Sequence, residues 1–488
     1  MTNHNPERYR LLLNADKLAQ LAEATQRPLL PALRINTLKI NVDEARRTWP
    51  EWYGWDVQSV PFCDTGWQIA AGGEELSRTL EYRMGFYYIQ DAASMLPAEM
   101  FAFDEPDRPL ILDMAASPGG KTTHLACKTN DGGLIIANDT SSGRIGALRS
   151  NLQDWGAIGT AVTNYPGERF GNWFPESFDV ALLDAPCSGE SLRTAERRKT
   201  RPVSAKEREQ LHQRQVRLLT SAFQAVKPGG QVVYATCTLA PEEDEAVVDA
   251  LLNLYPQQAT VEAVDRLLPI PAPGLASDGA RTFHPQVQRA VRLWPHLYDT
   301  SGFFATLIRK HDSVTVRREA RIRMRVYDPP PARPLAKIGL EPLARREQAD
   351  VINRLRQEYG FDLDMLIERQ ALTFWRRQKL VYAIAEQFLA RFADLPCAAV
   401  GMLIGERAAE GFVPSHEFVA RFGARFTGRR FRLADDQIEK WLAGYDLRGL
   451  EATLYPAGAV IILEDDKQRF LGRGKVQRDR VRNMLPKK

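Results

Sequence analysis

Short apolar runs alternate with longer amphipathic stretches between residues 109 and 310. Each run is almost continuously hydrophobic, which is typical of a strand buried on both faces of a sheet. The intervening stretches, at residues 121–129, 144–155 and 206–226, repeat apolar positions with helical spacing. This alternation predicts an α/β fold: a mostly parallel, twisted sheet with helices on both faces. The apolar runs are PLILDMAAS (109–117), GLIIANDTS (133–141), GTAVTNY (159–165), FDVALLDAPCS (178–188), GGQVVYATCTLAP (229–241) and GFFATLIRK (302–310).

The regions on either side have different patterns. Residues 1–80 combine a helical stretch, alternating β-branched residues and the hairpin signal VPFCDTGWQIAAGG, which together indicate an α+β part. Residues 311–345 are rich in arginine and contain the stiff, extended spacer YDPPPARP. Helical patterning returns in residues 346–393, and residues 394–488 carry strand-like runs such as AVIILE. We therefore predict five segments, with a core at residues 81–310 and boundaries after residues 80, 310, 345 and 393.

Composition and charge exclude several classes of protein. Of the 488 residues, 44% are hydrophobic and 26% are charged, which is the balance of a soluble globular protein. We find no apolar stretch long enough to cross a bilayer, and the polar N-terminus lacks the apolar core of a secretion signal. Five cysteines in a chain of this length do not form a disulfide framework, which favours a reducing cytoplasm. A net charge of +4 permits a nucleic-acid partner without indicating one.

A glycine-rich turn follows the first apolar run of the central region. Three interpretations of it are open: a loop for the amino-acid part of a methyl donor, a triphosphate loop of the Walker type, or a structural turn. The triphosphate motif needs glycine where this chain has alanine, at position 115. A methyl-donor site predicts a ribose-binding carboxylate after the next strand, and Asp139 lies there. The turn consists of Ala115, Ala116, Ser117, Pro118, Gly119, Gly120 and Lys121.

Two cysteines directly follow neighbouring apolar runs. Cys187 comes after the run that ends at Asp184, and Cys237 comes after the next run along the chain. Because ligands bind at the carboxyl ends of the strands in open α/β sheets, both thiols are predicted to lie beside the glycine-rich turn. A lone buried cysteine is more often structural, but two at adjacent strand ends favour a catalytic role. No catalytic role is assigned to the other cysteines, Cys63, Cys127 and Cys397.

Around these residues the chain resembles the NOL1/NOP2/Sun family of RNA cytosine-C5 methyltransferases. The resemblance covers roughly residues 30–310 and rests on several long motifs. It implies a Rossmann-like class I methyltransferase core that uses S-adenosyl-L-methionine, together with an N-terminal RNA-binding part. The motifs are RINTLK (34–39), GFYYIQDAASMLP (85–97), AASPGGKTT (115–123), DAPCSGE (184–190), KPGGQVVYATCTLAPEEDEAVV (227–248) and RLWPHLYDTSGFF (292–304).

The resemblance also implies a covalent mechanism. Cys237 corresponds to the nucleophile that adds to carbon 6 of cytosine, which makes the unreactive carbon 5 an enamine carbon able to attack the donor methyl group. Cys187 corresponds to the residue that helps to release the product, and Asp184 is placed to hydrogen-bond or protonate the ring N3. This order of the two thiols comes from the family, since the related DNA enzymes carry the nucleophile in the proline-cysteine motif.

Donor contacts are carried over in the same way. One position departs from the family: many members have an aspartate near the adenine, and this chain has Pro166 there, so a backbone contact would have to replace it. The segment after the proline-cysteine motif, residues 191–202, is also richer in arginine than in many members. The residues that match donor contacts are those at positions 115–121, Asp139, Arg144 and Asp184.

Beyond residue 310 the resemblance narrows to a subfamily that modifies 16S ribosomal RNA and carries a β-rich, PUA-like RNA-binding domain at its C-terminus. The implied partner is 16S ribosomal RNA or the small ribosomal subunit, with transfer RNA as an alternative substrate. A P-loop-like ATPase and a non-catalytic ribosome-assembly factor are the alternatives from other classes. We expect a cytoplasmic monomer with no membrane partner and no metal. Basic clusters at residues 193–201, 309–325 and 467–488 are candidate phosphate contacts.

Overall fold

The chain divides into two structural units. The computed structural model describes residues 9–10, 12–103, 108–191, 203–314, 332–408, 411–449 and 455–486. Unit 1 contains Met1–Leu76, Tyr87–Arg149 and Ala161–Pro330, and unit 2 contains Ser77–Phe86, Ser150–Thr160 and Pro331–Lys488. Among the described helices, none is both long and apolar enough to cross a membrane.

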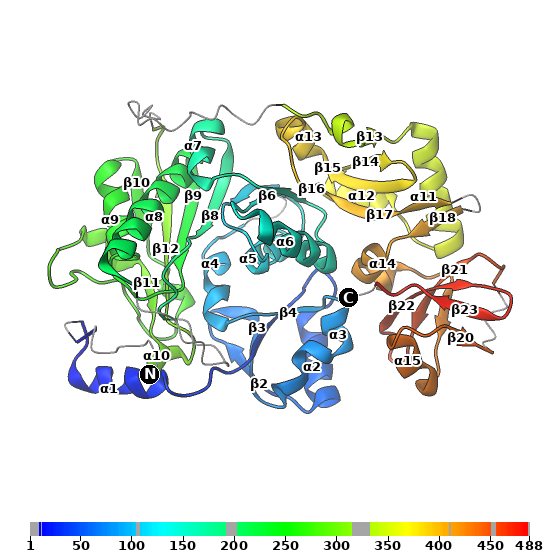
Figure 1. Ribbon diagram of the computed structural model, residues 1–488, viewed down its shortest axis with the longest axis horizontal. Coiled ribbons are helices and arrows are strands. Elements are labelled where there is room, and N and C mark those ends of the chain that lie inside the picture. Colours follow the sequence, from blue (N-terminus) through cyan, green and yellow to red (C-terminus); the bar gives the residue numbers. More distant parts are fainter. Residues whose placement is uncertain are drawn as a thin grey trace. The chain divides into compact units, whose positions relative to one another are not determined.

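The apolar runs form the central sheet of unit 1 (Figure 1). Its strands are β5 (Leu110–Asp113), β6 (Leu134–Asn138), β7 (Thr160–Thr163), β8 (Phe178–Asp184), β9 (Val226–Thr236), β10 (Ala259–Glu262), β11 (Val291–Leu293) and β12 (Phe303–Lys310). Their order is β10-β12-β9-β8-β5-β6-β7, with β11 beside β12. The pairs β5–β6, β5–β8 and β8–β9 are parallel, whereas β12 runs antiparallel to β9 and β10. Both β5 and β6 are buried along their whole length, which explains their unbroken hydrophobic sequence.

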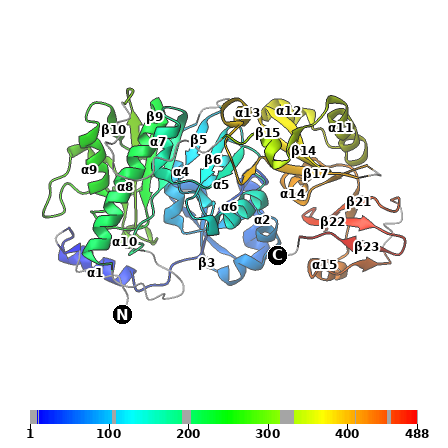
Figure 2. The same ribbon diagram turned by 45° about the horizontal axis from the view of Figure 1, so that its top comes forward.

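Helices connect these strands and cover the sheet. They are α4 (Leu96–Glu99), α5 (Gly120–Lys128), α6 (Ser142–Trp155), α7 (Phe170–Trp173), α8 (Ala205–Ala225), α9 (Glu245–Leu254) and α10 (Pro295–Tyr298). Helix α8 begins at a capping box formed by Ser204 and Glu207, and it packs against α7, α9, β8 and β9. Figures 1 and 2 both show α8 and α9 alongside β9 and β10. The predicted α/β core with a mostly parallel sheet is therefore confirmed.

A second, antiparallel sheet forms the N-terminal part of unit 1. It contains β1 (Ala32–Ile35), β2 (Asp56–Val60), β3 (Cys63–Ala71) and β4 (Tyr87–Ile89) in the order β2-β3-β1-β4, and the helices α1 (Ala15–Ala24) and α2 (Val42–Tyr53) precede and follow β1. The predicted hairpin is the β2–β3 pair. Because β4 also belongs here, the boundary expected after residue 80 falls inside this sheet. A strand of three residues is too short to show a periodic pattern in the sequence.

Unit 2 carries two further sheets, as the predicted β-rich C-terminal region requires. The first has the order β13-β14-β15-β17-β18 and the second β19-β21-β22-β23-β20. The strands are β13 (Glu341–Pro342), β14 (Leu372–Arg377), β15 (Leu380–Ala385), β16 (Ala399–Val400), β17 (Met402–Ala408), β18 (Gly411–Pro414), β19 (Arg430–Arg432), β20 (Leu447–Arg448), β21 (Val460–Glu464), β22 (Phe470–Val476) and β23 (Arg480–Asn483). The helices are α3 (Leu80–Arg83), α11 (Arg345–Tyr359), α12 (Asp364–Gln370), α13 (Glu386–Phe392), α14 (His416–Phe422) and α15 (Asp435–Leu442).

The segment 346–393, expected to be helical, is helical only in part. Strands β14 and β15 form a hairpin within it, and the same sheet continues into β17 beyond residue 393. The hairpin sequence LTFWRRQKLVYAIA alternates buried with half-buried side chains, and Leu372, Phe374 and Val381 face the core of unit 2. The boundary expected after residue 393 therefore falls inside one sheet. The period-two pattern of these residues was the signal for it.

Candidate active site

The glycine-rich turn lies at the carboxyl end of β5 and leads directly into α5. Gly119 precedes the helix with a φ of 113°, a left-handed conformation that favours glycine. A Cβ atom on Gly120 would lie 3.0 Å from Gln90 Oε1 and 3.3 Å from a ring carbon of Tyr88, so glycine lets these side chains approach the backbone. The turn thereby places the N-terminus of α5 at the carboxyl edge of the sheet, where a helix can bind an anionic group.

Asp139 follows β6 and lies against the same turn. Its Oδ2 accepts a hydrogen bond from the Ser117 N–H at 3.2 Å, and its Oδ1 accepts one from the Ser141 N–H at 2.8 Å. The Arg144 guanidinium donates to the Ser117 carbonyl and lies 3.5 Å from Asp139 Oδ2. The structure therefore brings together three residues that the sequence nominated separately: Ser117, Asp139 and Arg144.

The turn after β7 lies next to Asp139. The Asn164 side chain donates to the Asp139 carbonyl at 2.6 Å, and the Tyr165 carbonyl accepts a hydrogen bond from Asn138 at 2.9 Å. Pro166 is exposed and precedes a short 3-10 helix. Asn164 is a polar side chain at this edge that the sequence did not nominate.

Lys121 and Asp184 form an ion pair between α5 and the end of β8. The Lys121 Nζ lies 2.7 Å from Asp184 Oδ2. Burial alone would lower the pKa of Lys121, but attraction to the negative charges of Asp184 and Cys237 raises it above its usual value. Lys121 is therefore positively charged and interacts with both Asp184 and Cys237.

The two nominated cysteines meet at the ends of β8 and β9. These strands are parallel neighbours, with Asp184 opposite Ala235, so the residues that follow them leave the sheet side by side. The Cys187 Sγ and Cys237 Sγ atoms lie 2.9 Å apart, and both side chains are half-buried. The hydrogen bond to Cys237, together with burial and the nearby charges of Glu243 and Asp184, raises the pKa of the Cys187 thiol well above its usual range. Cys187 is therefore held in its neutral form.

Asp113 and Arg34 also contact this region, and the sequence analysis gave neither a role. Asp113 ends β5 and is fully buried; Thr122 donates to its Oδ2 at 2.6 Å, and burial raises its pKa to about 7. Arg34, on β1, donates to the Gly120 carbonyl at 3.0 Å and to Thr123 Oγ1 at 2.7 Å. Their only sequence signals were a carboxylate that closes an apolar run and the arginine of the RINTLK motif.

A buried ion-pair network supports the segment that follows Cys237. The Arg292 Nε lies 2.7 Å from Glu245 Oε1, its Nη2 lies 3.1 Å from Asp244 Oδ2, and all three side chains are fully buried. Arg292 Nη1 also donates to the Leu239 carbonyl at 3.0 Å, two residues after Cys237. The guanidinium therefore joins β11, the start of α9 and the cysteine segment.

Replacing Arg292 with methionine should destabilise the protein by about 3–5 kcal/mol, because two buried carboxylates lose their counter-charge. Urea denaturation followed by circular dichroism measures this loss. Arg309→Met is a matched control, since Arg309 pairs with Glu262 where both side chains are about one-third exposed, and it should cost less than about 1 kcal/mol. Equal losses in the two variants would show that the buried network stabilises the protein no more than the partly exposed pair of Arg309 and Glu262 does.

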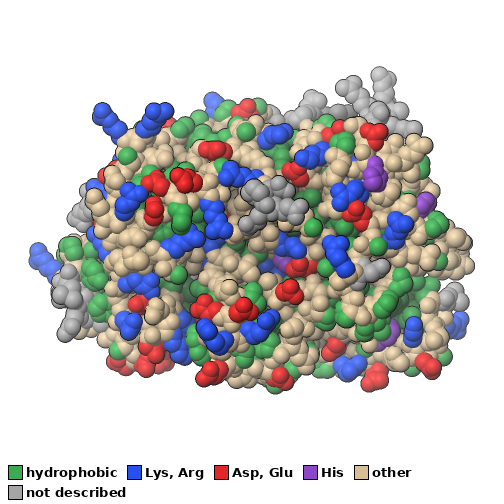
Figure 3. Space-filling view, turned by 180° about the vertical axis from the view of Figure 1, so that it is seen from behind, with side chains coloured by type: hydrophobic (Ala, Val, Ile, Leu, Met, Phe, Trp, Pro, Cys, Tyr) green, Lys and Arg blue, Asp and Glu red, His purple; other side chains and the backbone are tan. Residues whose placement is uncertain are grey.

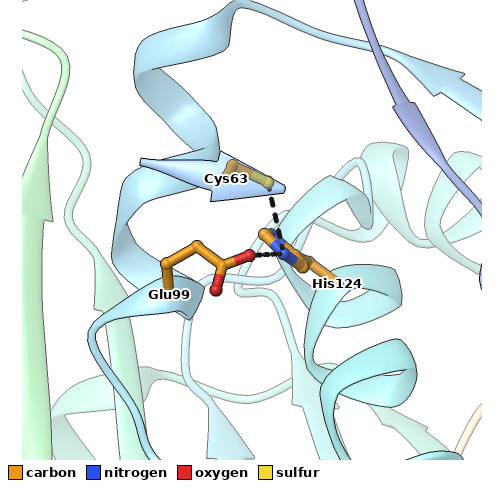
Figure 4. Close-up of side chains that lie close together, drawn as sticks. All are labelled: Cys63, Glu99 and His124. Atoms are coloured by element: carbon orange, nitrogen blue, oxygen red, sulfur yellow. Dashed lines mark hydrogen bonds and ion pairs between the residues drawn. The ribbon is translucent and has the colours of Figure 1, made fainter. Parts of the chain in front are cut away.

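Away from the two cysteines, a cluster of three side chains that could ligate a metal lies on β3, α4 and α5 (Figure 4). His124 Nε2 lies 2.8 Å from Glu99 Oε1 and 3.9 Å from Cys63 Sγ, and Lys128 pairs with Glu99 at 2.7 Å. Burial raises the pKa of Cys63 to about 12 and lowers that of His124 to about 4, so both groups are neutral at pH 7. The positive charges of Lys128 and the nearby Arg34 oppose a bound cation here. Cys63 is the first residue of β3.

The candidate phosphate contacts are only partly described. Residues 193–201 and 315–325 lie outside the described residues. Arg309 pairs with Glu262 at 2.6 Å, and the buried Lys310 donates to a backbone carbonyl at 2.7 Å, so these two basic groups already have structural partners. The exposed basic residues of the C-terminal cluster include Lys475, Arg478 and Arg482.

Comparison with known proteins gives consistent matches. A family model described as 16S rRNA methyltransferase RsmB/F matches residues 100–309, and one described as the N-terminal domain of 16S rRNA methyltransferase RsmF matches residues 3–92. The chain is 33% identical to the ribosomal RNA small subunit methyltransferase F of Erwinia tasmaniensis, over 98% of this chain and 94% of that protein. It is also 33% identical to the protein of that name from Klebsiella pneumoniae, over 87% and 83% of the two chains.

Solved structures are similar over the methyltransferase part. A methyltransferase homolog from Pyrococcus horikoshii aligns with a TM-score of 0.55 and 31% identity, over 62% of this chain and 93% of that one. NSun6 from the same organism, solved with SFG, aligns with a TM-score of 0.52 and 21% identity over 62% and 97% of the two chains, a likeness of fold.

Proposed function

The chain belongs to the RsmB/F family of 16S rRNA methyltransferases, and from this premise we propose that it methylates carbon 5 of cytosine in 16S ribosomal RNA, with S-adenosyl-L-methionine as donor. The family and subfamily resemblance found in the motifs is thereby confirmed. The observation that carries the proposal is the pair of thiols, Cys187 and Cys237, 2.9 Å apart beside the Lys121–Asp184 ion pair. A covalent cytosine methylation needs a nucleophile, a second group for release and a charge that stabilises the thiolate.

The residues around the glycine-rich turn fit the donor. Gly119 adopts the left-handed conformation that the turn needs, Gly120 lets Gln90 and Tyr88 approach the backbone, and Asp139 holds the turn through Ser117. Asp113 Oδ1 is buried and has no hydrogen-bond partner among the described residues. It could therefore accept a hydrogen bond from an amine or a hydroxyl group of the bound S-adenosyl-L-methionine. When bound, the donor supplies an electrophilic methyl group. Residues 115–121, Asp139, Arg144 and Asp184 would hold it.

We keep the roles that the family resemblance implies for the two cysteines, and the charges around them are consistent with those roles. Cys237, which interacts with the Lys121 ammonium, is the sulfur that adds to carbon 6 of the cytosine. Asp184 lies at the same edge, where its carboxylate can accept a hydrogen bond from the ring N3 once N3 is protonated, and Lys121 supplies its counter-charge. At the end of the reaction water takes the proton from carbon 5, the carbon 5–carbon 6 double bond forms again, and the bond from carbon 6 to Cys237 breaks with its electron pair on the sulfur. Cys187, held as a thiol, donates a hydrogen bond to the departing sulfur.

Asp139→Ala should weaken binding of S-adenosylhomocysteine by about 10- to 100-fold, because a charge-assisted hydrogen bond is worth roughly 1.5–3 kcal/mol and the turn also loses its anchor at Ser117. Isothermal titration calorimetry measures the dissociation constant. Asp43→Ala, at an exposed carboxylate on α2, is the control and should leave affinity unchanged. If Asp139→Ala binds as tightly as the wild type, the donor site has been placed wrongly.

RNA contacts in unit 2 are part of the proposal. We assign the β-rich C-terminal part of unit 2, including β22 and β23, to a PUA-like RNA-binding domain, with the exposed Lys475, Arg478 and Arg482 as phosphate contacts. On the face shown in Figure 3, Lys and Arg side chains are interspersed with Asp and Glu side chains. RNA affinity should therefore come from local basic clusters rather than from one broad positive field.

Bisulfite sequencing of total RNA from a strain that lacks the gene tests the proposed function. A 16S ribosomal cytosine that becomes unmethylated, and is methylated again when the gene is restored, supports it. Loss of methylation in transfer RNA alone would point to the alternative substrate. Unchanged methylation would favour an assembly factor, and thermal stabilisation by ATP but not by S-adenosylmethionine would favour an ATPase.

A further inference from the structure

Glu243 lies fully buried between Cys237 and α9, and its side chain reaches the loop that carries Cys187. Its Oε2 accepts hydrogen bonds from the Ser188 N–H at 2.8 Å and from Gln215 Nε2 at 3.0 Å. Gln215, on α8, also donates to the Pro186 carbonyl at 3.0 Å. The residues on both sides of Cys187 are thus held by one carboxylate and one amide.

The carboxylate also brings a negative charge close to Cys187. Among the described residues, Glu243 forms an ion pair with Arg208, whose Nη1 lies 3.7 Å from Glu243 Oε1. The same guanidinium makes two hydrogen bonds of 2.7 and 3.1 Å to Glu190. Arg208 is therefore shared between two acids and leaves Glu243 only partly compensated. The titratable and charged groups facing Glu243 and Cys187 from the surrounding elements are Asp184, Glu190, Arg208, Tyr234, Cys237 and Asp244.

We propose that Glu243 is a positioning residue that fixes the loop of Cys187 against Cys237 and, by its charge, keeps Cys187 a thiol. This inference rests on the proposed methyl transfer, in which Cys187 donates a hydrogen bond to the departing sulfur. A thiolate at that position could not donate and would repel the leaving thiolate of Cys237. Glu243 acts through the loop and through Coulombic repulsion, without touching substrate.

Physical chemistry gives the sign of the charge effect. A negative charge beside a thiol disfavours its ionisation, and Glu243 is among the groups that raise the pKa of Cys187. Glu243→Gln keeps an oxygen for the Ser188 N–H but removes the charge, so the pKa of Cys187 should fall. Gln215→Leu removes the hydrogen bonds to the Pro186 carbonyl and to Glu243 Oε2, but it leaves the charge of Glu243 in place.

Alkylation with iodoacetamide over a range of pH, followed by peptide mass spectrometry of the full-length protein, tests the charge effect without any methylation. We expect the midpoint for Cys187 to fall by about one pH unit in Glu243→Gln. Glu242→Gln, the same change at the adjacent half-buried position, should leave the midpoint where it is. An unchanged or raised midpoint in Glu243→Gln overturns the proposal.

The lifetime of the protein–RNA adduct tests the positioning effect. Glu243→Gln and Gln215→Leu should each slow adduct release about tenfold with little change in the KM for RNA, and Gln215→Leu should do so without lowering the alkylation midpoint. If Glu243→Gln fails to fold, Gln215→Leu still decides, since normal release in that variant contradicts the positioning role. If the wild-type protein methylates no RNA, the proposed function fails. The alkylation experiment still tests whether the charge of Glu243 acts on Cys187.

Discussion

Cys237→Ala is expected to abolish methyl transfer, lowering the rate by at least about a thousandfold. Carbon 5 of cytosine is too weak a nucleophile to attack a methyl group until a thiolate has added to carbon 6. Only Cys237 combines a place at the end of β9 with a Coulombic interaction with Lys121, among the described cysteines. Incorporation of tritium from labelled S-adenosylmethionine into target RNA measures the loss.

The donor affinity of this variant should be unchanged, because no nominated donor contact is removed. Cys397→Ala, a half-buried cysteine of unit 2, is the control and should keep full activity. Substantial activity in Cys237→Ala would exclude this thiol as the nucleophile. If Cys237→Ala instead accumulates a covalent adduct, Cys187 attacks and the two roles are reversed.

Cys187→Ala is expected to trap the covalent protein–RNA adduct. The alanine cannot donate a hydrogen bond to the departing sulfur, and the 2.9 Å contact between the thiols is lost. Addition to carbon 6 should still proceed, because Cys237 and Lys121 remain. On a denaturing gel, the fraction of protein that migrates with RNA should rise by about 10- to 100-fold over the wild type, equivalent to roughly 1.4–2.7 kcal/mol on the release barrier.

The double variant Cys187→Ala, Cys237→Ala is the informative control for this adduct. It should give no covalent band, since the attacking sulfur is gone. A band that persists in the double variant would mean that another residue bonds to RNA. Rapid turnover by Cys187→Ala without an adduct would remove Cys187 from product release.

The sequence was sufficient for the central sheet and for much of the candidate site. Strands β5 and β6 were predicted because both of their faces are buried along their whole length, and β8 and β9 because of their buried apolar stretches at residues 180–183 and 232–235. In a parallel sheet the carboxyl ends of the strands share one edge. That rule alone places Asp139, Cys187 and Cys237 along the edge where the glycine-rich turn lies.

Contacts between distant segments could not be predicted in this way. Arg34 reaches Gly120 across 86 positions, and Gln215 reaches Glu243 across 28, so no local pattern relates them. Burial of a charged or amide side chain depends on the neighbours that the tertiary fold supplies. Strands β4, β14 and β15 were not predicted, for different reasons. Strand β4 has too few residues to show a periodic pattern. The alternating pattern of β14 and β15 lies between the helices α12 and α13, in a segment that was predicted to be helical.

The buried guanidinium of Arg34 determines how this polypeptide can be dissected. It is fully enclosed and links the N-terminal sheet to the first turns of α5. A fragment that began at β5 would lose both hydrogen bonds that Arg34 donates to the start of α5, at the Gly120 carbonyl and at Thr123 Oγ1. The part of unit 1 that contains the central sheet therefore cannot be exchanged on its own. A chimera or truncation has to keep the N-terminal sheet and α5 together.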